Sequence, residues 1–255
     1  MEIPDQKDAF GHEMYDHLHG KKSFEIIERN DGLFNVSMGA PLYFSPFQEW
    51  MDVEKQAIQH ARGRVLDIGC GAGRHALYLQ EQGLEVMGID SSPLAIKTCQ
   101  ERGVKDARLL ALTQVAKKLG VFDTILMMGN NFCLLGTPER AVRLLKRYAK
   151  VTSPAGQIIA FTRNPYGFNP HTTPEPEHTS YHQWNRENGR MGGQARIRVR
   201  YKKYVSDWID FLMVSPQEME ALLTPTSWRI EQILEGEAGI YCALLHKPEQ
   251  MNERK

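Results

Sequence analysis

Residues 65–90 constrain the fold more than any other part of the chain, because an apolar run, a glycine-rich turn, a helical pattern and a second apolar run follow one another directly. The first apolar run covers 65–68, the helical pattern covers 74–82, and the second apolar run covers 84–89. A glycine follows the helical pattern and tolerates the left-handed backbone of a helix end. Strand, turn, helix and strand in this order predict one half of a nucleotide-binding α/β sheet.

The turn contains Gly69, Gly71 and Gly73, and the second strand ends in Asp90. Without a Cβ, the chain can turn sharply at these glycines, and its backbone N–H groups can approach a ligand closely. The Asp90 carboxylate can accept hydrogen bonds from both hydroxyls of a ribose. The G-x-G-x-G spacing differs from the G-x-G-x-x-G of dinucleotide sites. Asp67, two positions before the first glycine, would repel a pyrophosphate but suits a ligand with a cationic amine.

These residues resemble motif I and the acidic residue that follows it in class I methyltransferases, which use S-adenosyl-L-methionine (SAM). The resemblance covers residues 62–163 well and residues 215–247 loosely. It implies that SAM is the cofactor, with the glycine turn against its methionine part and Asp90 at its ribose. The cofactor-binding residues expected on this basis are Asp67, Gly69, Cys70, Gly71, Gly73, Asp90, Ser91, Thr113, Met128 and Asn130.

Two positions depart from the family pattern. The acid that often follows the third strand and contacts the adenine amine is missing, which leaves Thr113 or Gln114 to assist backbone groups. The strand over 122–128 ends in Gly-Asn-Asn-Phe, whereas amino methyltransferases of nucleic acids often carry Asn-Pro-Pro-Tyr or Asp-Pro-Pro-Tyr there. Asn130 and Asn131 can orient a substrate or contact SAM, although asparagines after a strand are also ordinary turn residues. The motif therefore disfavours a nucleic-acid base as acceptor.

We expect a single methyltransferase domain over 1–255, with a Rossmann-like α/β sheet that is mostly parallel, has an antiparallel last strand and carries helices on both faces. A β-hairpin insertion and an N-terminal helical cap would complete it. Residues 1–63 would form the cap and support, and 64–163 the SAM-binding core. Residues 164–214 would form a substrate-shaping insertion with the hairpin, and 215–247 the C-terminal part of the core.

Local patterns predict several elements of the cap and the insertion. Ser45-Pro46 predicts a helix start, with serine as N-cap and proline at the first helical position. Proline and histidine are frequent over 164–180, which predicts no regular element there. Polar and apolar residues alternate over 194–201, so this segment is expected to be a half-buried strand whose hairpin partner returns over 205–213.

The polar face of the expected strand carries Arg196, Arg198 and Arg200. Such a row could bind an anionic substrate or RNA phosphates. A row of this kind is more often a solvated strand face. Both interpretations stay open at this point.

Composition excludes some classes of partner. The chain has 31 basic and 31 acidic residues, so no overall field draws it to nucleic acid or membrane. Its four cysteines are scattered and form no CxxC pair, which favours reduced thiols in a cytosol. The polar N-terminal residues contain no signal-peptide core, and no apolar run has membrane-spanning length. We therefore expect a cytoplasmic protein without a membrane partner, as a monomer or homodimer.

The expected function is in-line transfer of the SAM methyl group to a nucleophile on a small molecule. The alternatives are an RNA or protein methyltransferase, or a non-catalytic SAM-binding protein; the glycine spacing disfavours an NAD-dependent oxidoreductase. The general base is unknown, and weak candidates for catalysis or substrate positioning are Tyr15, His17, Asn131 and His171, with Tyr43, Tyr181 and His182 behind them. The histidines near the N-terminus lack the spacing of a metal site, and methyl transfer from a sulfonium needs no metal, so none is expected.

Overall fold

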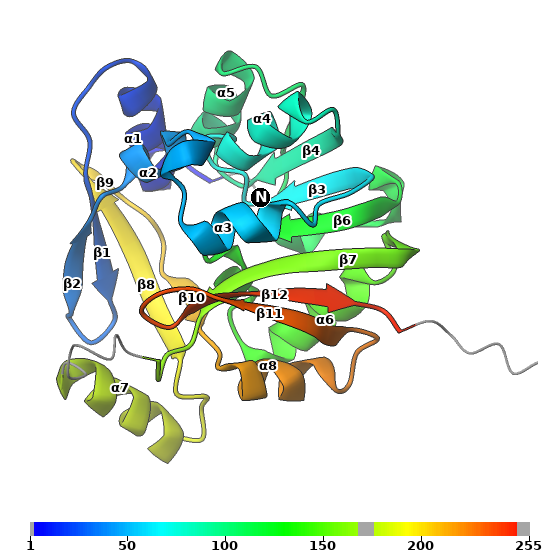
Figure 1. The fold of residues 1–255 in the computed structure, drawn as a ribbon. Helices are drawn as coiled ribbons and strands as arrows, with labels where there is room; N and C mark the ends of the chain where they lie inside the picture. The colour runs from blue at the N-terminus through cyan, green and yellow to red at the C-terminus, as the bar shows by residue number, and fades with distance from the viewer. Residues whose placement is uncertain (1–2, 168–175, 249–255) are drawn as a thin grey trace, which may run out of the picture.

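The structure is a computed structural model that describes residues 3–167 and 176–248, and its main element is a seven-stranded sheet (Figure 1). The strands of this sheet are β3 (Arg64–Ile68), β4 (Glu85–Asp90), β5 (Asp106–Leu109), β6 (Phe122–Met127), β7 (Thr152–Arg163), β11 (Arg229–Glu235) and β12 (Ile240–His246). Their order is β11-β12-β7-β6-β3-β4-β5. All strands of this sheet run in the same direction except β12, which is antiparallel to both β7 and β11. The expected mostly parallel sheet with an antiparallel last strand is confirmed.

Helices cover both faces of the main sheet, as Figure 1 shows. Helices α3 (Asp52–Ile58), α4 (Arg74–Glu81) and α5 (Pro93–Glu101) lie on one face, and α6 (Pro138–Tyr148) and α8 (Pro216–Leu223) lie on the other. Because side chains alternate along a strand, Val65 packs into the core under α3 and α4, and Leu66 packs into the core under α6 and α8. The two apolar cores therefore cover the two faces of the sheet, and polar residues can occupy the edge at which its parallel strands end.

Serine or threonine caps begin three of these helices, each followed by a proline. The side chains of Ser92, Thr137 and Ser215 accept backbone N–H groups at the starts of α5, α6 and α8. Proline suits the next position because the first helical N–H has no partner within the helix. A serine or threonine before a proline thus marks the start of each of these three helices.

A second, antiparallel sheet stands at the carboxyl edge of the main sheet (Figure 1). Its order is β10-β8-β1-β2, and β9 also pairs with β8. The bounds of these strands are β1 (Glu25–Arg29), β2 (Phe34–Ser37), β8 (Gln194–Tyr201), β9 (Tyr204–Val205) and β10 (Ile209–Leu212). The N-terminal residues therefore contribute the β1–β2 hairpin to this sheet in addition to helices. The turn at Asn30-Asp31-Gly32 joins the two strands, and Asp-Gly is a common hairpin signal.

The remaining N-terminal elements include α1 (Ala9–Leu18) and α2 (Ala40–Phe44), with 3-10 turns η1 (Asp5–Lys7) and η2 (Phe47–Glu49). The helix predicted from Ser45-Pro46 is wrong in its start, because only η2 follows and α3 begins at Asp52. Trp50 and Met51 have extended backbone, and the Trp50 Nε1 donates to the Ser45 carbonyl at 2.9 Å. This bond folds the segment back and interrupts the helix.

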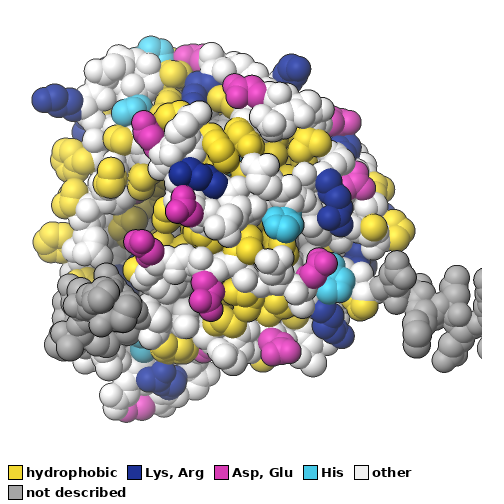
Figure 2. Space-filling view, in the orientation of Figure 1, with side chains coloured by type: hydrophobic (Ala, Val, Ile, Leu, Met, Phe, Trp, Pro, Cys, Tyr) yellow, Lys and Arg dark blue, Asp and Glu magenta, His cyan; other side chains and the backbone are white. Residues whose placement is uncertain are grey.

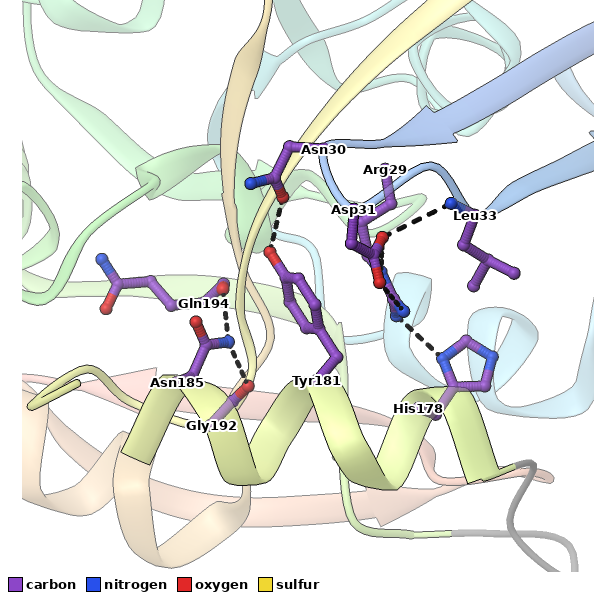
Figure 3. A network of polar contacts seen from close by, with 9 residues as sticks. All are labelled: Arg29, Asn30, Asp31, Leu33, His178, Tyr181, Asn185, Gly192 and Gln194. Carbon is purple, nitrogen blue, oxygen red and sulfur yellow. Dashed lines mark hydrogen bonds and ion pairs between the residues drawn. The ribbon is translucent and has the colours of Figure 1, made fainter. Parts of the chain in front are cut away.

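Helix α7 (Pro176–Glu187) corrects the expectation that no regular element occurs up to residue 180. Figure 3 shows how its side chains attach it to the second sheet. The Tyr181 hydroxyl donates to Asn30 Oδ1 at 2.7 Å, and Asn185 Nδ2 donates to the carbonyls of Gly192 and Gln194 at 2.9 and 2.8 Å. Proline is compatible with the first turn of a helix, and these contacts stabilise the rest. No helix in the described part of the chain is long and apolar enough to cross a membrane.

Candidate cofactor and acceptor site

The candidate site lies where the carboxyl ends of β3, β4 and β6 meet, the edge at which parallel α/β sheets bind ligands. The turn η5 (Asn131–Leu135) follows β6 here and packs against β10 of the second sheet. Figure 2 shows a hollow between the second sheet and the main body, with hydrophobic side chains at its floor. Residues distant in sequence therefore surround one space.

The glycine turn after β3 has a backbone that other residues rarely adopt. Gly69, Gly71 and Gly73 have φ values of 73°, 54° and 80°. The Gly69 N–H donates to the Ile89 carbonyl at 2.8 Å, which ties the turn to β4. A Cβ on Gly69 would lie 2.7 Å from the amide nitrogen of Asn131. Both the conformation and the close approach require glycine at the first position.

Asp90 and Asn131 hold this turn from two sides. The Asp90 carboxylate accepts hydrogen bonds from the backbone N–H groups of Gly71 at 3.1 Å and Ser92 at 2.9 Å. Asn131 Nδ2 donates to the carbonyls of Ile68 at 2.9 Å and Gly69 at 2.8 Å. Asn131, a candidate for substrate orientation, therefore has a geometric role in fixing the turn.

Asp67 provides the test of whether a SAM-like ligand fits. Its side chain is 1% exposed, and its Oδ2 has no hydrogen-bond partner among the described residues. Burial and the neighbouring Asp90 raise the pKa of Asp67 to about 7, against an opposing effect of Arg74. A buried acceptor without a donor is costly, and an ammonium group would satisfy it. The half-buried Asp90 carboxylate, which has acceptor capacity left, would take ribose hydroxyls. The residues present fit the amino and ribose groups of SAM.

An ion pair behind the turn was not anticipated from the sequence. Arg74, the first residue of α4, pairs with Glu54 of α3 and donates to Ser45 Oγ at 3.0 Å. Glu54 is 2% exposed, so this pair is shielded from water. A cation at a helix N-terminus opposes the helix dipole. A basic residue at the start of a predicted helix is therefore a sequence feature from which an acidic partner for Arg74 could have been predicted.

Comparison with known proteins agrees with this geometry. Residues 65–156 match the family model described as "Methyltransferase domain". A SAM-dependent methyltransferase from Bacteroides fragilis, solved with S-adenosyl-L-homocysteine, is similar over 97% of this chain and 98% of its own, with 28% identity and a TM-score of 0.81. Residues 65–156 thus match a methyltransferase domain, and the chain has the fold of class I SAM-dependent methyltransferases.

Curated relatives match the methyltransferase domain over part of their length. Glycine N-methyltransferase of Mus musculus is 29% identical over 42% of this chain and 42% of its own. A ubiquinone biosynthesis O-methyltransferase of Dechloromonas aromatica is 31% identical over 47% of this chain and 52% of its own. The chain thus spans about half the length of the curated relatives it matches.

The other expected cofactor residues divide into three groups. Asn130 has a left-handed backbone (φ 66°) beside the turn, and Ser91 follows Asp90 and is half-exposed. The Cys70 and Met128 side chains are instead buried in the core beneath. Thr113 is exposed in η3 (Leu112–Gln114), where its carbonyl accepts from Arg147 of α6. Side-chain contacts to the cofactor are therefore expected from the first group only.

The remaining weak catalytic candidates lie outside the matched residues 65–156. The Tyr15 ring packs against His19 and lies 4.6 Å from the Lys97 ammonium of α5. His17 Nδ1 lies 3.2 Å from Ser23 Oγ, so its ring is held by the cap. Tyr181 and His182 belong to the inner side of α7, where burial lowers the pKa of His182 to about 4. His171 lies outside the described residues.

Tyr43 is the candidate whose side chain contacts a buried carboxyl group, that of Glu25. Its hydroxyl donates to Glu25 Oε1 at 3.1 Å, and its carbonyl accepts from Arg102, which also donates to the carbonyl of Ala72 in the glycine turn. Glu25 and its buried neighbour Glu13 were not singled out from the sequence.

Proposed function

We propose that this chain is a methyltransferase that transfers a methyl group from SAM to a small molecule. The observation that carries the proposal is the glycine turn fixed by Asp90 and Asn131, with the unpartnered Asp67 oxygen beside it. The whole-length similarity to a structure that contains S-adenosyl-L-homocysteine supports the same cofactor here. The curated relatives include an N-methyltransferase and an O-methyltransferase, so they leave the acceptor atom open.

Each residue of the proposed cofactor site has a defined task. Asp67 would hold the amino group of SAM, Asp90 would hold the ribose hydroxyls, and the glycines would let the backbone approach. When bound, SAM supplies an electrophilic methyl group on a positively charged sulfur. The protein then contributes mainly orientation, because the thioether leaves without needing a proton. In this proposal residues 64–163 bind the cofactor, and residues 1–63 and 164–214 shape the acceptor site.

The position of α1 supports a small acceptor. Asp8 caps α1 by accepting from Gly11 N at 3.0 Å, and it also accepts from Ser92 Oγ at 2.9 Å and Leu94 N at 3.2 Å. These bonds fasten α1 to the start of α5, directly after Asp90. A side chain on Gly11 would collide with Ser92 and Asp8. A cap held this closely favours an enclosed acceptor over a polymer.

The arginine row gives little support to an RNA substrate. Arg198 and Arg200 both pair with Glu28, at 2.7 and 2.6 Å, and Arg196 pairs with Asp210 at 3.2 Å. Side chains neutralised in this way attract phosphates less than free arginines do. The alternating strand is better explained as an ion-paired sheet face.

Titration calorimetry with SAM and S-adenosyl-L-homocysteine tests the proposal first. Saturable binding of both ligands is expected, followed by transfer of labelled methyl groups to compounds of a small-molecule cell extract. Binding without transfer to any fraction would indicate a non-catalytic SAM-binding protein. Label entering RNA or protein would replace the small-molecule acceptor, and absence of binding by folded protein would refute the assignment.

A further inference from the structure

The connection from β5 to β6 differs from the other crossovers of the main sheet. Helices α4, α5 and α6 lie in the connections from β3 to β4, from β4 to β5 and from β6 to β7, whereas only the 3-10 turns η3 and η4 (Lys117–Leu119) lie between β5 and β6. Parallel strands are usually joined through a helix that covers a face of the sheet. Two short turns take the place of that helix here, and a pocket lies between residues 115–117 and α6.

This pocket has the size and the apolar lining of a small-molecule site. Its volume is about 770 Å³, within the range of roughly 300–1,000 Å³ that is typical of ligand pockets. Its apolar lining consists of Ala116 and Val142, which are half-buried, and of Val115 and Val151, which are buried. The methylene stems of long basic side chains add to such a lining. An apolar group of a ligand would therefore find contacts in this pocket.

Basic side chains surround the apolar lining. The residues that line the pocket include five basic residues and a single acid, Glu139. The basic residues are Lys117 of η4, Arg143, Lys146 and Arg147 of α6, and Lys150, two positions after that helix. The chain as a whole has equal numbers of basic and acidic residues, so positive charge is concentrated at this place. A concave surface lined by one sign of charge attracts ligands of the opposite sign, here anions.

Most of these cations lack the partners that neutralise basic residues elsewhere in the molecule. The side chains of Lys117, Arg143, Lys146 and Lys150 are exposed, and they form no ion pair or hydrogen bond within residues 3–167 and 176–248. Arg147 donates to the carbonyl of Thr113, and Glu139 accepts from the Thr137 hydroxyl at 2.9 Å. The pocket thus presents four cations that are accessible to a ligand, whereas the arginines of β8 are ion-paired.

A solvated helix end accounts for only part of this cluster. Lys146 and Arg147 lie in the last turn of α6, where cations interact favourably with the helix dipole. Arg143 lies a turn earlier and Lys117 belongs to another element, so the dipole does not account for them. Basic residues four apart on a helix, such as Arg143 and Arg147, also repel each other. A bound anion would relieve this repulsion.

We infer that this pocket binds a small organic phosphate, an anion with two negative charges and an apolar part. Phosphate oxygens accept charge-assisted hydrogen bonds from several lysine and arginine side chains at once, and the apolar part would contact Ala116 and Val142. The basic residues surround one pocket instead of following an extended groove, which favours a small molecule over RNA. No residue of the glycine turn lines the pocket, so this site is separate from the proposed methyl-transfer site.

Calorimetric titration with 1-naphthyl phosphate tests the inference, because this probe has a phosphate dianion, an apolar ring system and no adenosine to enter the cofactor site. We expect saturable binding to one site, with and without S-adenosyl-L-homocysteine, and weaker binding as salt is added. Inorganic phosphate and 1-naphthol each lack one of the two features and should bind roughly tenfold or more weakly. Absence of saturable binding would overturn the inference, and equal binding of inorganic phosphate would remove the apolar part from it. Tighter binding of a single-stranded RNA oligonucleotide at the same residues would replace the small molecule by RNA.

The variants Arg143→Gln and Lys146→Gln each remove one charge from an exposed side chain of the pocket. Each should weaken binding of 1-naphthyl phosphate by roughly fivefold without lowering the melting temperature. Arg140→Gln is the matched control, because Arg140 lies on the same helix and does not line the pocket. This control should bind the probe as the wild type does. An equal loss in all three variants would indicate a general effect of charge and would contradict a site in the pocket.

Chemical acetylation of lysines, measured by mass spectrometry of peptides, locates the bound probe. 1-Naphthyl phosphate should protect Lys117, Lys146 and Lys150 from the reagent. Lys203 is the reference, because it is exposed in the turn between β8 and β9 and does not line the pocket. Protection confined to the three pocket lysines supports the assignment, whereas equal protection of Lys203 would show unspecific association and refute it.

Discussion

Replacing Asp90 by alanine tests the proposed cofactor site most directly. The substitution removes the carboxylate that would hold the ribose hydroxyls, and it also removes acceptors for the Gly71 and Ser92 N–H groups. A hydrogen bond to a charged group contributes about 1.5–3 kcal/mol, so SAM affinity should fall by roughly 10- to 150-fold. The effect on folding should be smaller, because the pKa of Asp90 is raised by burial, which shows that burying its charge offsets part of what the two hydrogen bonds contribute.

Calorimetric titration with S-adenosyl-L-homocysteine measures the affinity, and urea denaturation measures the free energy of unfolding. Asp106→Ala is the control, because this aspartate on the neighbouring strand β5 pairs with Arg108 instead of contacting the glycine turn. The control should bind as the wild type does. Wild-type affinity in folded Asp90→Ala protein would refute the ribose assignment and would leave Asp90 as a residue that only shapes the turn.

Three further predictions test the turn, the buried acid and the core. Asn131→Ala should lower SAM affinity by about tenfold, because two carbonyls of the turn lose their donor; calorimetry measures this, and unchanged affinity would show that Gly69 holds its conformation alone. Since the pKa of Asp67 is raised to about 7 and the SAM amino group requires the carboxylate, affinity should increase as pH rises toward about 7, by at most about tenfold per pH unit, with proton release detectable in buffers of different ionisation enthalpy. An equally steep pH profile in Asp67→Asn would refute this linkage. Trp228→Phe should lower the free energy of unfolding by about 1–3 kcal/mol in urea titrations, because a fully buried indole loses its bond to the Leu145 carbonyl; it should leave SAM binding unchanged, and a loss of binding would indicate a longer-range role.

The core could be predicted because its signals are local. The turn at Gly69 to Gly73 requires left-handed backbone, and three serine or threonine caps before proline mark the helix starts after Asp90, in α6 and in α8. Buried parallel strands read as apolar runs, so β6 was recognisable from composition alone. Each of these features depends on neighbours in sequence, which is why the predictions agree with the structure.

The second sheet could not be predicted because its pairing is long-range. Strand β8 pairs with β1, as in the register of Val199 with Ile27, across most of the chain. The helix expected from Ser45 fails for a related reason, since the Trp50 indole contact outweighs a good local capping signal. Local propensity predicts an element only where tertiary contacts do not compete with it.

The same reasoning explains why Glu13 and Glu25 escaped detection while Asp67 and Asp90 did not. Asp67 and Asp90 lie within one strand–turn–helix–strand unit, whose spacing brings them together before any tertiary contact forms. Glu13 and Glu25 come from a helix and a strand that meet only when α1 is fastened by Asp8 to the start of α5 and β1 enters the second sheet. In the proposed function, the elements that would shape the acceptor site are thus those with the weakest local signals. Asp8→Ala should therefore impair use of the acceptor more than binding of S-adenosyl-L-homocysteine.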